Sequence, residues 1–351
     1  MSDYHEQLRK KYTLRLRECI GKLPEFCEEF FWATADNTLI RTRVGYAYDL
    51  KLFFGYLTEF RRSFAGLDAA NLSMEDLKKV TPEDIEAFMD YLTFYVSRRE
   101  DSTVELQNAE RGKSRKLSAI KSLINYYYKK RRLDSNPAAL VDFPKLRDKA
   151  ITRLEVDEVA KLLDEVESGE KLTDGQKKYH KYTKTRDLAI VTLLLGTGIR
   201  LSECVGINIP HINFEVGGIK ITRKGGNETV VYFGDEVMDA LELYLTEREN
   251  MEAAEGHEDA LFLSMQKKRI TDRAVQNLVK KYSVLVTNLK NISPHKLRST
   301  FGTNLYRETG DIYLVADVLG HSDVNTTRKH YAEVAEDNRR KAARVVKLRR
   351  E

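Results

Sequence analysis

The chain has 351 residues, of which 42% are hydrophobic and 32% are charged. This composition is typical of a soluble globular protein with about two domains. The longest apolar run, LAIVTLLL at 188–195, is too short to cross a bilayer, and the N-terminal MSDYHEQLRKKY has no apolar signal-peptide core. We therefore expect a cytoplasmic protein that does not bind a membrane.

The three cysteines, Cys19, Cys27 and Cys204, show neither a paired spacing nor a metal-ligand pattern. Isolated cysteines of this kind are more often small core residues than reactive groups. The sequence predicts no disulfide, no metal site and no cofactor.

The net charge of +5 is modest, but the basic residues are unevenly distributed. The segment RGKSRKLSAIKSLINYYYKKRR at 111–132 carries nine Lys or Arg and no acidic residue, and RRKAARVVKLRR at 339–350 is similar. Such clusters suit a polyanionic partner, although a single one is more often a solvated helix face. The tyrosines of NYYY could stack on bases, but at helical spacing they are more often core residues.

The first 146 residues read as helices. The sequences SMED (73–76) and TPED (81–84) are capping boxes that begin two of them, and IEAFMDYLTFYV continues the second with apolar residues at helical spacing. A further apolar stripe stops at DSNP (134–137). We assign residues 1–146 to a helical N-terminal domain and the polar segment 147–153 to a linker.

Residues 154–337 predict a second domain of mixed α/β character. The sequence RDLAIVTLLLGTGIRLSECV indicates a buried helix, a glycine turn and a short second helix, and GGIKITRKGGNETVVYF (217–233) indicates a β-hairpin. We expect the polar insertion at 168–184 to be a surface loop or an irregular helix pair. These patterns predict a mainly α-helical protein with a small antiparallel β-sheet, followed by a basic tail at 338–351.

Four stretches of the second domain, GTGIRLSE, RKGGN, SPHKLRSTF and LGHSDVNTTRKHYAEV, carry side chains that suit phosphodiester chemistry. These side chains are Arg200, Lys224, His295, Arg298, His321 and Tyr331. Arg200 follows a tight glycine turn, and the three-residue spacing places His295 and Arg298 on one face of a first helical turn, after a Ser293 cap.

These residue types share a chemical logic. Two guanidiniums can clamp the non-bridging oxygens of a phosphate under attack without a metal ion. A lysine can protonate a departing 5′ oxygen, and a tyrosine phenol becomes a nucleophile when a positive cluster favours its phenolate. Each stretch alone has a simpler explanation, such as a surface arginine, a chance HxxR or a helix end capped by Gly320. Their order and combination favour catalysis.

In this order the four stretches resemble the catalytic domain of the tyrosine recombinases, also called the phage integrase family. Upstream, TRVGYAYDLKLFFGYL and SRKLSAIKSLINYYYKKRRLDSNPA resemble that family's helical core-binding domain. The resemblance implies a SAM-like core-binding domain within 1–146 and a tyrosine-recombinase catalytic domain at 154–337. Residues 1–41 are too brief for an arm-binding domain, which indicates the simple Xer-like type.

The resemblance implies that Arg200 and Arg298 clamp the phosphate and that Glu203 steadies the site. Tyr331 would attack DNA to leave a 3′-phosphotyrosyl link and a free 5′ hydroxyl, and a 5′ hydroxyl of a partner strand would reverse the step without ATP or metal. Basic residues of 111–132 would hold DNA phosphates. Those assigned to this contact are Lys113, Arg115, Lys116 and Lys121.

His295 and His321 match the supporting histidines of the family, and Lys224 matches the hairpin lysine that protonates the leaving oxygen. One departure lies in the hairpin, where members commonly have Gly-Lys-Gly but Arg223 precedes Lys224 here. The insertion at 168–184 is a second departure and matches no known role.

The implied partners are double-stranded DNA with inverted half-sites, held by a C-shaped clamp, and further copies of the chain. The copies would form a dimer on one site and a tetramer in synapsis. The tail at 338–351 either docks on a neighbouring protomer or adds DNA affinity as a solvated basic segment. Integration or excision of a mobile element and resolution of replicon dimers both stay open as biological roles, as does any accessory protein.

Two other functions are kept as alternatives. A type IB topoisomerase uses a similar set of side chains but relaxes one duplex as a monomer. A DNA-binding regulator that has lost catalysis would keep the same fold. The presence of all six candidate residues argues against the silent regulator. The paired histidines of HxxR and LGHS and the helical neighbour of the linker favour the recombinase over the topoisomerase.

Overall fold

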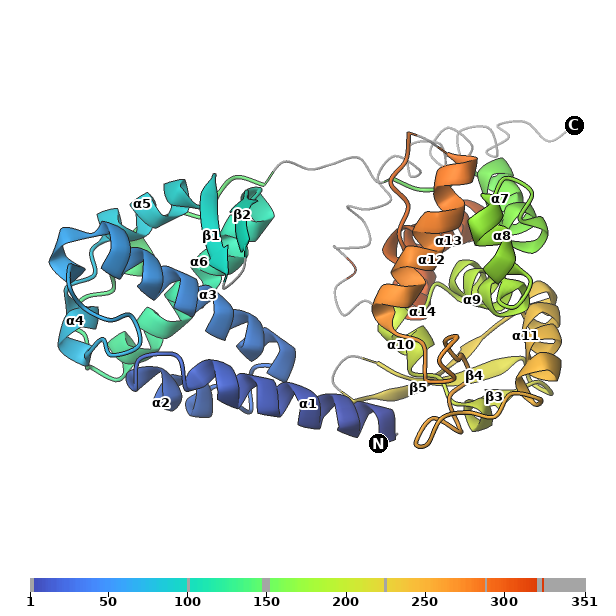
Figure 1. Cartoon of the computed structure of the whole chain (residues 1–351), viewed down its shortest axis with the longest axis horizontal. Helices are drawn as coiled ribbons and strands as arrows, with labels where there is room; N and C mark the ends of the chain where they lie inside the picture. The colour runs from blue at the N-terminus through green and yellow to red at the C-terminus, as the bar shows by residue number, and fades with distance from the viewer. Residues whose placement is uncertain are drawn as a thin grey trace, which may run out of the picture. The chain divides into compact units, whose positions relative to one another are not determined.

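Contacts divide the chain into two compact units, Met1–Lys149 and Ala150–Glu351 (Figure 1). The structure is a computed structural model, and the residues that it describes are 3–99, 102–146, 152–223, 226–287, 289–320 and 324. No helix within these ranges combines the length and the apolar character needed to span a lipid bilayer. The linker predicted at 147–153 lies mostly outside them.

Unit 1 is built around α3, which contacts α1, α5 and α6. Its core is rich in aromatic side chains, including the fully buried Phe53, Phe88 and Tyr127. The helices of this unit are α1 (Asp3–Ile20), α2 (Phe26–Ala33), α3 (Ile40–Phe60), α4 (Met74–Lys78), α5 (Pro82–Tyr91) and α6 (Glu110–Lys129), with 3-10 turns η1 (Arg62–Phe64) and η2 (Pro137–Leu140).

The helix starts of α4 and α5 confirm both predicted capping boxes. The hydroxyl of Ser73 accepts the Asp76 N–H, that of Thr81 accepts the Asp84 N–H, and each aspartate accepts a backbone N–H in return. These bonds satisfy orphan donors of the first helical turn.

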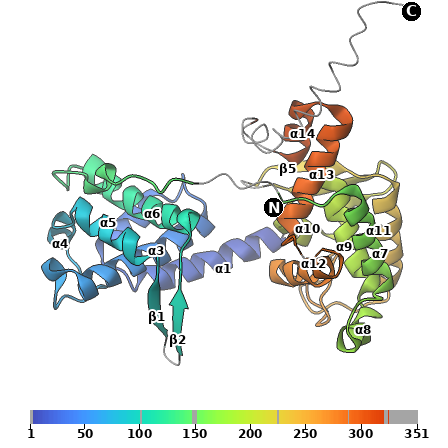
Figure 2. The same ribbon diagram turned by 90° about the horizontal axis from the view of Figure 1, so that it is seen from above.

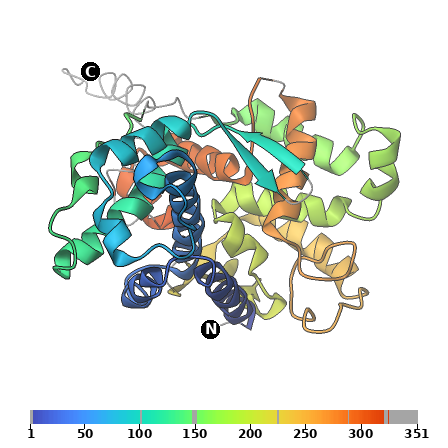
Figure 3. The same cartoon turned by 60° about the vertical axis from the view of Figure 1, so that its left-hand side comes forward.

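The segment 95–106 corrects the prediction that the N-terminal domain is helical throughout. Helix α5 ends at Tyr91, and β1 (Tyr95–Arg99) then pairs antiparallel with β2 (Ser102–Leu106). The two strands project from the helices of unit 1 as a hairpin (Figures 2 and 3). Tyr, Val and Thr favour strands, and in this segment that preference outweighs the helical apolar spacing that runs up to it.

Unit 2 combines helices with one small sheet. Its strands β3 (Ile212–Asn213), β4 (Gly218–Thr222) and β5 (Glu228–Tyr232) are antiparallel, in the order β3-β4-β5. This confirms the predicted hairpin. The helices of this unit are α7 (Val156–Ser168), α8 (Asp174–His180), α9 (Lys184–Thr197), α10 (Leu201–Val205), α11 (Asp235–Arg248), α12 (Asp272–Val286), α13 (Pro294–Thr309) and α14 (Ile312–Leu319), with a 3-10 turn η3 (Ile209–His211).

Helix α9 is the centre of unit 2. It contacts α7, α11 and α13, and its buried residues occur on every side of the helix, as expected for a helix surrounded by others. The loop that carries Arg200 follows α9 directly, so the packing of this helix positions the start of the candidate site.

The insertion at 168–184 is more ordered than predicted. It holds the regular helix α8, which begins with a capping box between Thr173 and Gln176. The side chain of His180 is buried, and its Nε2 lies 2.8 Å from the carbonyl oxygen of Val166 on α7. The buried His180 therefore connects α8 to α7.

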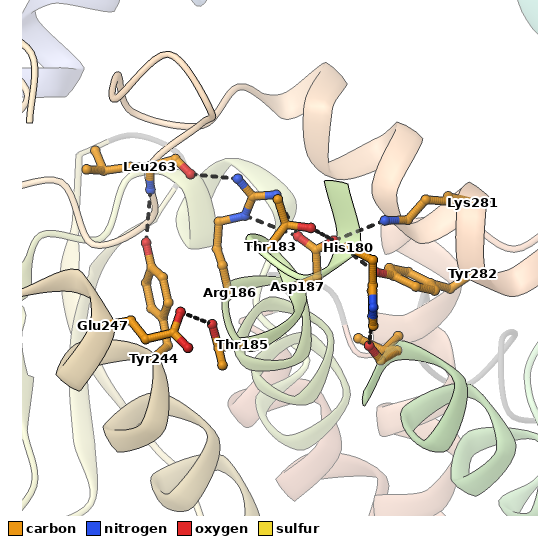
Figure 4. Close-up of polar contacts among 11 residues, drawn as sticks. His180, Thr183, Thr185, Arg186, Asp187, Tyr244, Glu247, Leu263, Lys281 and Tyr282 are labelled. Carbon is orange, nitrogen blue, oxygen red and sulfur yellow. Dashed lines mark hydrogen bonds and ion pairs between the residues drawn. The ribbon is translucent and has the colours of Figure 1, made fainter. Parts of the chain in front are cut away.

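A buried carboxylate joins α9 to α12 (Figure 4). Asp187 is 1% exposed, and its oxygens accept hydrogen bonds from Arg186 at 2.6 Å, Lys281 at 3.1 Å and the Tyr282 hydroxyl at 3.0 Å. Arg186 also donates to the carbonyl of Leu263 at 2.8 Å. The cluster thus connects two helices and the loop around residue 263.

Replacing Asp187 with alanine should destabilise unit 2 by about 3 kcal/mol, because two partly buried cations lose the buried carboxylate that they share. Hydrogen-exchange mass spectrometry should show faster exchange in α9 and α12, with the peptides of α3 and α6 as internal controls. Asp187→Asn, which keeps the shape and one acceptor oxygen, should exchange at an intermediate rate. Unaltered protection in Asp187→Ala would contradict this account.

Candidate active site

The turn after α9 requires glycine at position 198. Gly198 has a φ of +61°, and a Cβ added there would lie 2.3 Å from Cδ1 of Phe301 on α13. Both the backbone conformation and the close approach exclude a side chain. The turn brings the end of α9 against α13 and places Arg200 at the N-cap of α10.

Arg200 is held by Glu203, three residues further on. The backbone N–H of Arg200 donates to Oε2 of Glu203 at 2.7 Å, and its Nη1 donates to Oε1 at 2.9 Å. The Glu203 side chain is 3% exposed, whereas that of Arg200 is 34% exposed. Charge-assisted bonds of this kind restrict the guanidinium, so the buried carboxylate presents a cation that solvent can still reach.

Arg298 is buried one turn into α13. Its Nη1 donates to the carbonyl of Gly198 at 2.6 Å, and its Nη2 donates to the carbonyl of Leu319. A planar guanidinium can reach two separate acceptors at once. Arg298 therefore ties the turn before Arg200 to the last turn of α14.

The first turn of α13 differs in one detail from the prediction. Ser293 is the N-cap residue and Pro294 is the first helical residue, but the Ser293 side chain makes no capping hydrogen bond. Its carbonyl instead accepts the N–H groups of Lys296 and Leu297. The side chain of His295 is exposed, in contrast to Arg298 one turn later.

Three arginines meet at the C-terminal end of α14. Arg223 donates to the carbonyl of Val318 at 3.0 Å, Arg298 donates to that of Leu319, and Arg200 donates to that of Gly320 at 3.0 Å. The last carbonyls of a helix have no partner within it and carry partial negative charge. Guanidiniums from three different elements thus bind three consecutive carbonyls.

Gly320 ends α14 as the sequence predicts. It adopts the left-handed conformation, with a φ of +61°, and its N–H donates to carbonyls of the last turn. Its own carbonyl faces Arg200. The three other candidate catalytic residues, Lys224, His321 and Tyr331, lie outside the described residues.

The remaining chemistry of the described part of this unit is sparse. Burial raises the pKa of the Cys204 thiol on α10 well above its ordinary value, so the group stays protonated. All three cysteines are free and buried, as predicted for core residues. Among the described residues, no group of three or more His, Cys, Asp or Glu side chains is arranged to hold a metal ion.

The basic residues proposed for DNA contact all belong to α6 in unit 1, but their surroundings differ. Lys113 donates to the Thr93 hydroxyl at 2.7 Å, and the Lys121 ammonium lies 5.0 Å from the centre of the Phe143 ring. Arg115 is 52% exposed and pairs with Asp49, whose pKa is raised by burial although Arg115 opposes that effect.

Lys116 is placed differently from its neighbours. Only 7% of the residue is exposed, its ammonium donates to Oδ1 of Asn108 at 2.7 Å, and burial lowers its pKa. Burial limits the access of this ammonium to a DNA phosphate. The structure therefore gives Lys116 an internal contact with Asn108, and its contact with DNA stays a prediction.

Residues 152–338 match the model of the phage integrase family. The chain is 33% identical over 330 residues to the tyrosine recombinase XerC of Caldanaerobacter subterraneus, and the match covers 91% of this chain and 86% of the relative. It is 30% identical over 363 residues to the tyrosine recombinase XerS of Streptococcus thermophilus, and this match covers 93% of this chain and 97% of the relative.

Two solved structures share the fold. The Tn1549 transposon integrase in complex with circular intermediate DNA has a TM-score of 0.61 at 17% identity, over 88% of this chain and 95% of that one. The XerH site-specific recombinase bound to its difH substrate has a TM-score of 0.58 at 22% identity, over 83% of this chain and 75% of that one.

The chain therefore belongs to the phage integrase family. Within that family it is a tyrosine recombinase of the Xer type, an enzyme of site-specific DNA recombination. The family and the enzyme class predicted from the four sequence stretches are confirmed.

Arg298→Lys should destabilise the junction of α13 and α14, because lysine lacks the two separated Nη groups that reach the carbonyls of Gly198 and Leu319. A buried carbonyl without a donor costs about 1–3 kcal/mol. Thermal unfolding and hydrogen exchange across α14 measure this effect.

Arg307→Lys is the matched control, since Arg307 is on the same helix and forms a partly exposed pair with Glu155 at 3.0 Å. That substitution should change stability by less than about 1 kcal/mol. An equal loss of stability in the two variants would contradict the proposal that the two hydrogen bonds of Arg298 organise this junction.

Proposed function

We propose that this recombinase cuts DNA through Tyr331, which forms a 3′-phosphotyrosyl link and releases a 5′ hydroxyl. Arg200 and Arg298 bind the non-bridging oxygens of the scissile phosphate. Lys224 protonates the departing 5′ oxygen, and His295 and His321 assist the proton transfers. The phosphodiester energy is kept in the covalent link, so the reaction proceeds without ATP or a metal ion.

The convergence of Arg200 and Arg298 on the end of α14 supports this proposal most directly. Donors that are fixed before the reaction stabilise a developing negative charge without reorganising during it. Arg298 is fixed by two carbonyls and Arg200 by Glu203. The helix end that they bind leads in sequence to His321 and then to Tyr331.

The substrate in this proposal is double-stranded DNA with inverted half-sites, inside the cytoplasm. XerH and the Tn1549 integrase are described in complexes with DNA. Lys113, Arg115 and Lys121 contact the DNA backbone and position the protein without reading sequence. One dimer occupies each site, and two dimers form the tetramer that exchanges strands.

A type IB topoisomerase would use similar chemistry, but it would relax a single duplex. Incubating the protein with two DNA duplexes that carry its site, selected beforehand from a random library, tests the distinction. Recombinant joints between the duplexes support the proposal. Relaxation of supercoiled DNA without joints would overturn it in favour of the topoisomerase, and binding without either product would favour the silent regulator.

Tyr331→Phe should bind the site with unchanged affinity and form no covalent adduct on a nicked suicide substrate, because the nucleophilic oxygen is missing. Denaturing gel electrophoresis of the protein–DNA adduct is the measurement. An adduct that persists in this variant would place the nucleophile elsewhere.

The wild-type protein run with a chelator is the companion reaction. Adducts should form there at an undiminished rate, because guanidiniums supply the positive charge. A requirement for divalent ions would contradict that part of the mechanism.

Lys224→Ala should cleave ordinary DNA slowly, by a factor on the order of 10²–10⁴, which is typical when a general acid is lost. It should recover on a substrate with sulfur at the bridging 5′ position, since a thiolate leaves without a proton. Cleavage rates on the two substrates are compared with those of the wild type. Equal defects on both would demote Lys224 to phosphate binding.

A further inference from the structure

Arg223, the residue at which the hairpin departs from the usual family motif, joins the β4–β5 hairpin to α14. It follows β4 directly, and its backbone closes the hairpin end: its N–H donates to the Asn227 carbonyl at 2.7 Å, and its carbonyl accepts the Gly226 N–H at 3.0 Å. The sheet thereby fixes the backbone of Arg223. Its half-buried side chain crosses to α14 and donates to the Val318 carbonyl at 3.0 Å.

The contact between this guanidinium and α14 requires glycine at position 320. A Cβ added at Gly320 would lie 1.2 Å from Nη1 and 2.3 Å from Cζ of Arg223. These atoms would overlap completely, so the guanidinium occupies the space that any other residue at position 320 would fill. This requirement is separate from the positive φ of Gly320.

Within the described residues, one donor of the Arg223 guanidinium has no acceptor. Its Nε is buried and has no hydrogen-bond acceptor in the described part of the chain. A buried donor without a partner destabilises the folded state. The side chain of Arg223 is thus placed to donate to the Val318 carbonyl, although its own Nε is left without an acceptor among the described residues.

The contact connects two segments that both lead to candidate catalytic residues. Lys224 follows Arg223 directly, and His321 follows Gly320. Within the hairpin, Lys220 and Glu228 pair across β4 and β5 at 2.7 Å, which joins the strands to each other but not to α14. Arg223 supplies the side-chain hydrogen bond from the hairpin end to the helix.

We propose that Arg223 is a positioning residue of the strand-exchange site. By binding the Val318 carbonyl it holds the hairpin against the end of α14, so that Lys224 and the segment beginning at His321 act on the same phosphate. This inference rests on the proposed role of Lys224 as the acid that protonates the leaving oxygen. The residue that replaces the family's usual glycine before the lysine thus contributes a contact of its own.

Arg223→Ala tests the proposal on the nicked suicide substrate, with oxygen or sulfur at the bridging 5′ position. We expect cleavage at least about tenfold slower than wild type on the oxygen substrate, since a misplaced acid loses part of a contribution of about 10²–10⁴. On the sulfur substrate the rate should return to near the wild-type value, and half-site affinity in a gel-shift titration should stay close to that of the control variant.

Lys220→Ala is the matched control, because it removes one positive charge from the same hairpin without touching α14. It should cleave both substrates at wild-type rates. Equal slowing of Arg223→Ala on both substrates, accompanied by a lower melting temperature, would show a merely structural role and overturn the proposal. So would a loss of half-site affinity without a loss of cleavage rate at saturating protein.

Gly320→Ala provides an independent test, because its methyl group would displace the guanidinium. It should reproduce the oxygen-substrate defect, and the Arg223→Ala/Gly320→Ala double variant should be no slower than the slower single variant. Effects of contacting residues are non-additive in this way. Multiplied defects in the double variant would show that the two residues act separately.

The two proposals fail in different ways. If Lys224 is not the acid, Lys224→Ala itself shows equal defects on both substrates. If Lys224 is the acid but Arg223 does not position it, sulfur rescues Lys224→Ala but not Arg223→Ala. Arg223→Lys keeps the charge and loses the planar fork, so it should retain the substrate-dependent defect and supplies the same comparison should the alanine variant not fold.

Discussion

The end of α14 sets the main constraint on unit 2. The last carbonyls of a helix have no partner within it. Here the carbonyls of Val318, Leu319 and Gly320 each accept a hydrogen bond from one arginine. The arginines come from a β-hairpin, from a helix and from the turn that follows the central helix, three elements that are distant in sequence. Because each guanidinium reaches a different carbonyl, the position of α14 determines where all three charges lie. Packing and, under the proposed mechanism, catalysis therefore depend on the same few hydrogen bonds.

The support behind these arginines lies deeper in the unit. Gly198 allows α9 to end against α13, and Glu203 turns Arg200 outward while its own carboxylate stays buried. Asp187 in turn holds α9 to α12. These contacts connect a buried carboxylate, through the central helix, to a partly exposed guanidinium. A defect in the core would therefore reach the candidate site through α9.

Sequence patterns predicted the elements whose signals are local. The capping boxes at Ser73 and Thr81, the buried helix α9 and the β4–β5 hairpin follow from spacing within about ten residues. The strands β1 and β2 were missed because apolar spacing alone does not separate the end of a helix from the start of a strand. The burial of Lys116 was missed because a basic run looks alike whether its side chains face solvent or Asn108. The contact of Arg223 with Val318 spans 95 residues, and no local pattern encodes such a pairing.

The three arginines at the end of α14 also change what the retention of these residues indicates during evolution. Because they complete a helix end, a descendant that had lost recombination would still be selected to keep them for folding. Arginines in a divergent relative thus report an intact domain, and by themselves they do not report activity. Under the proposed mechanism, activity in such a relative is better judged from the residue that aligns with Tyr331 than from the three arginines.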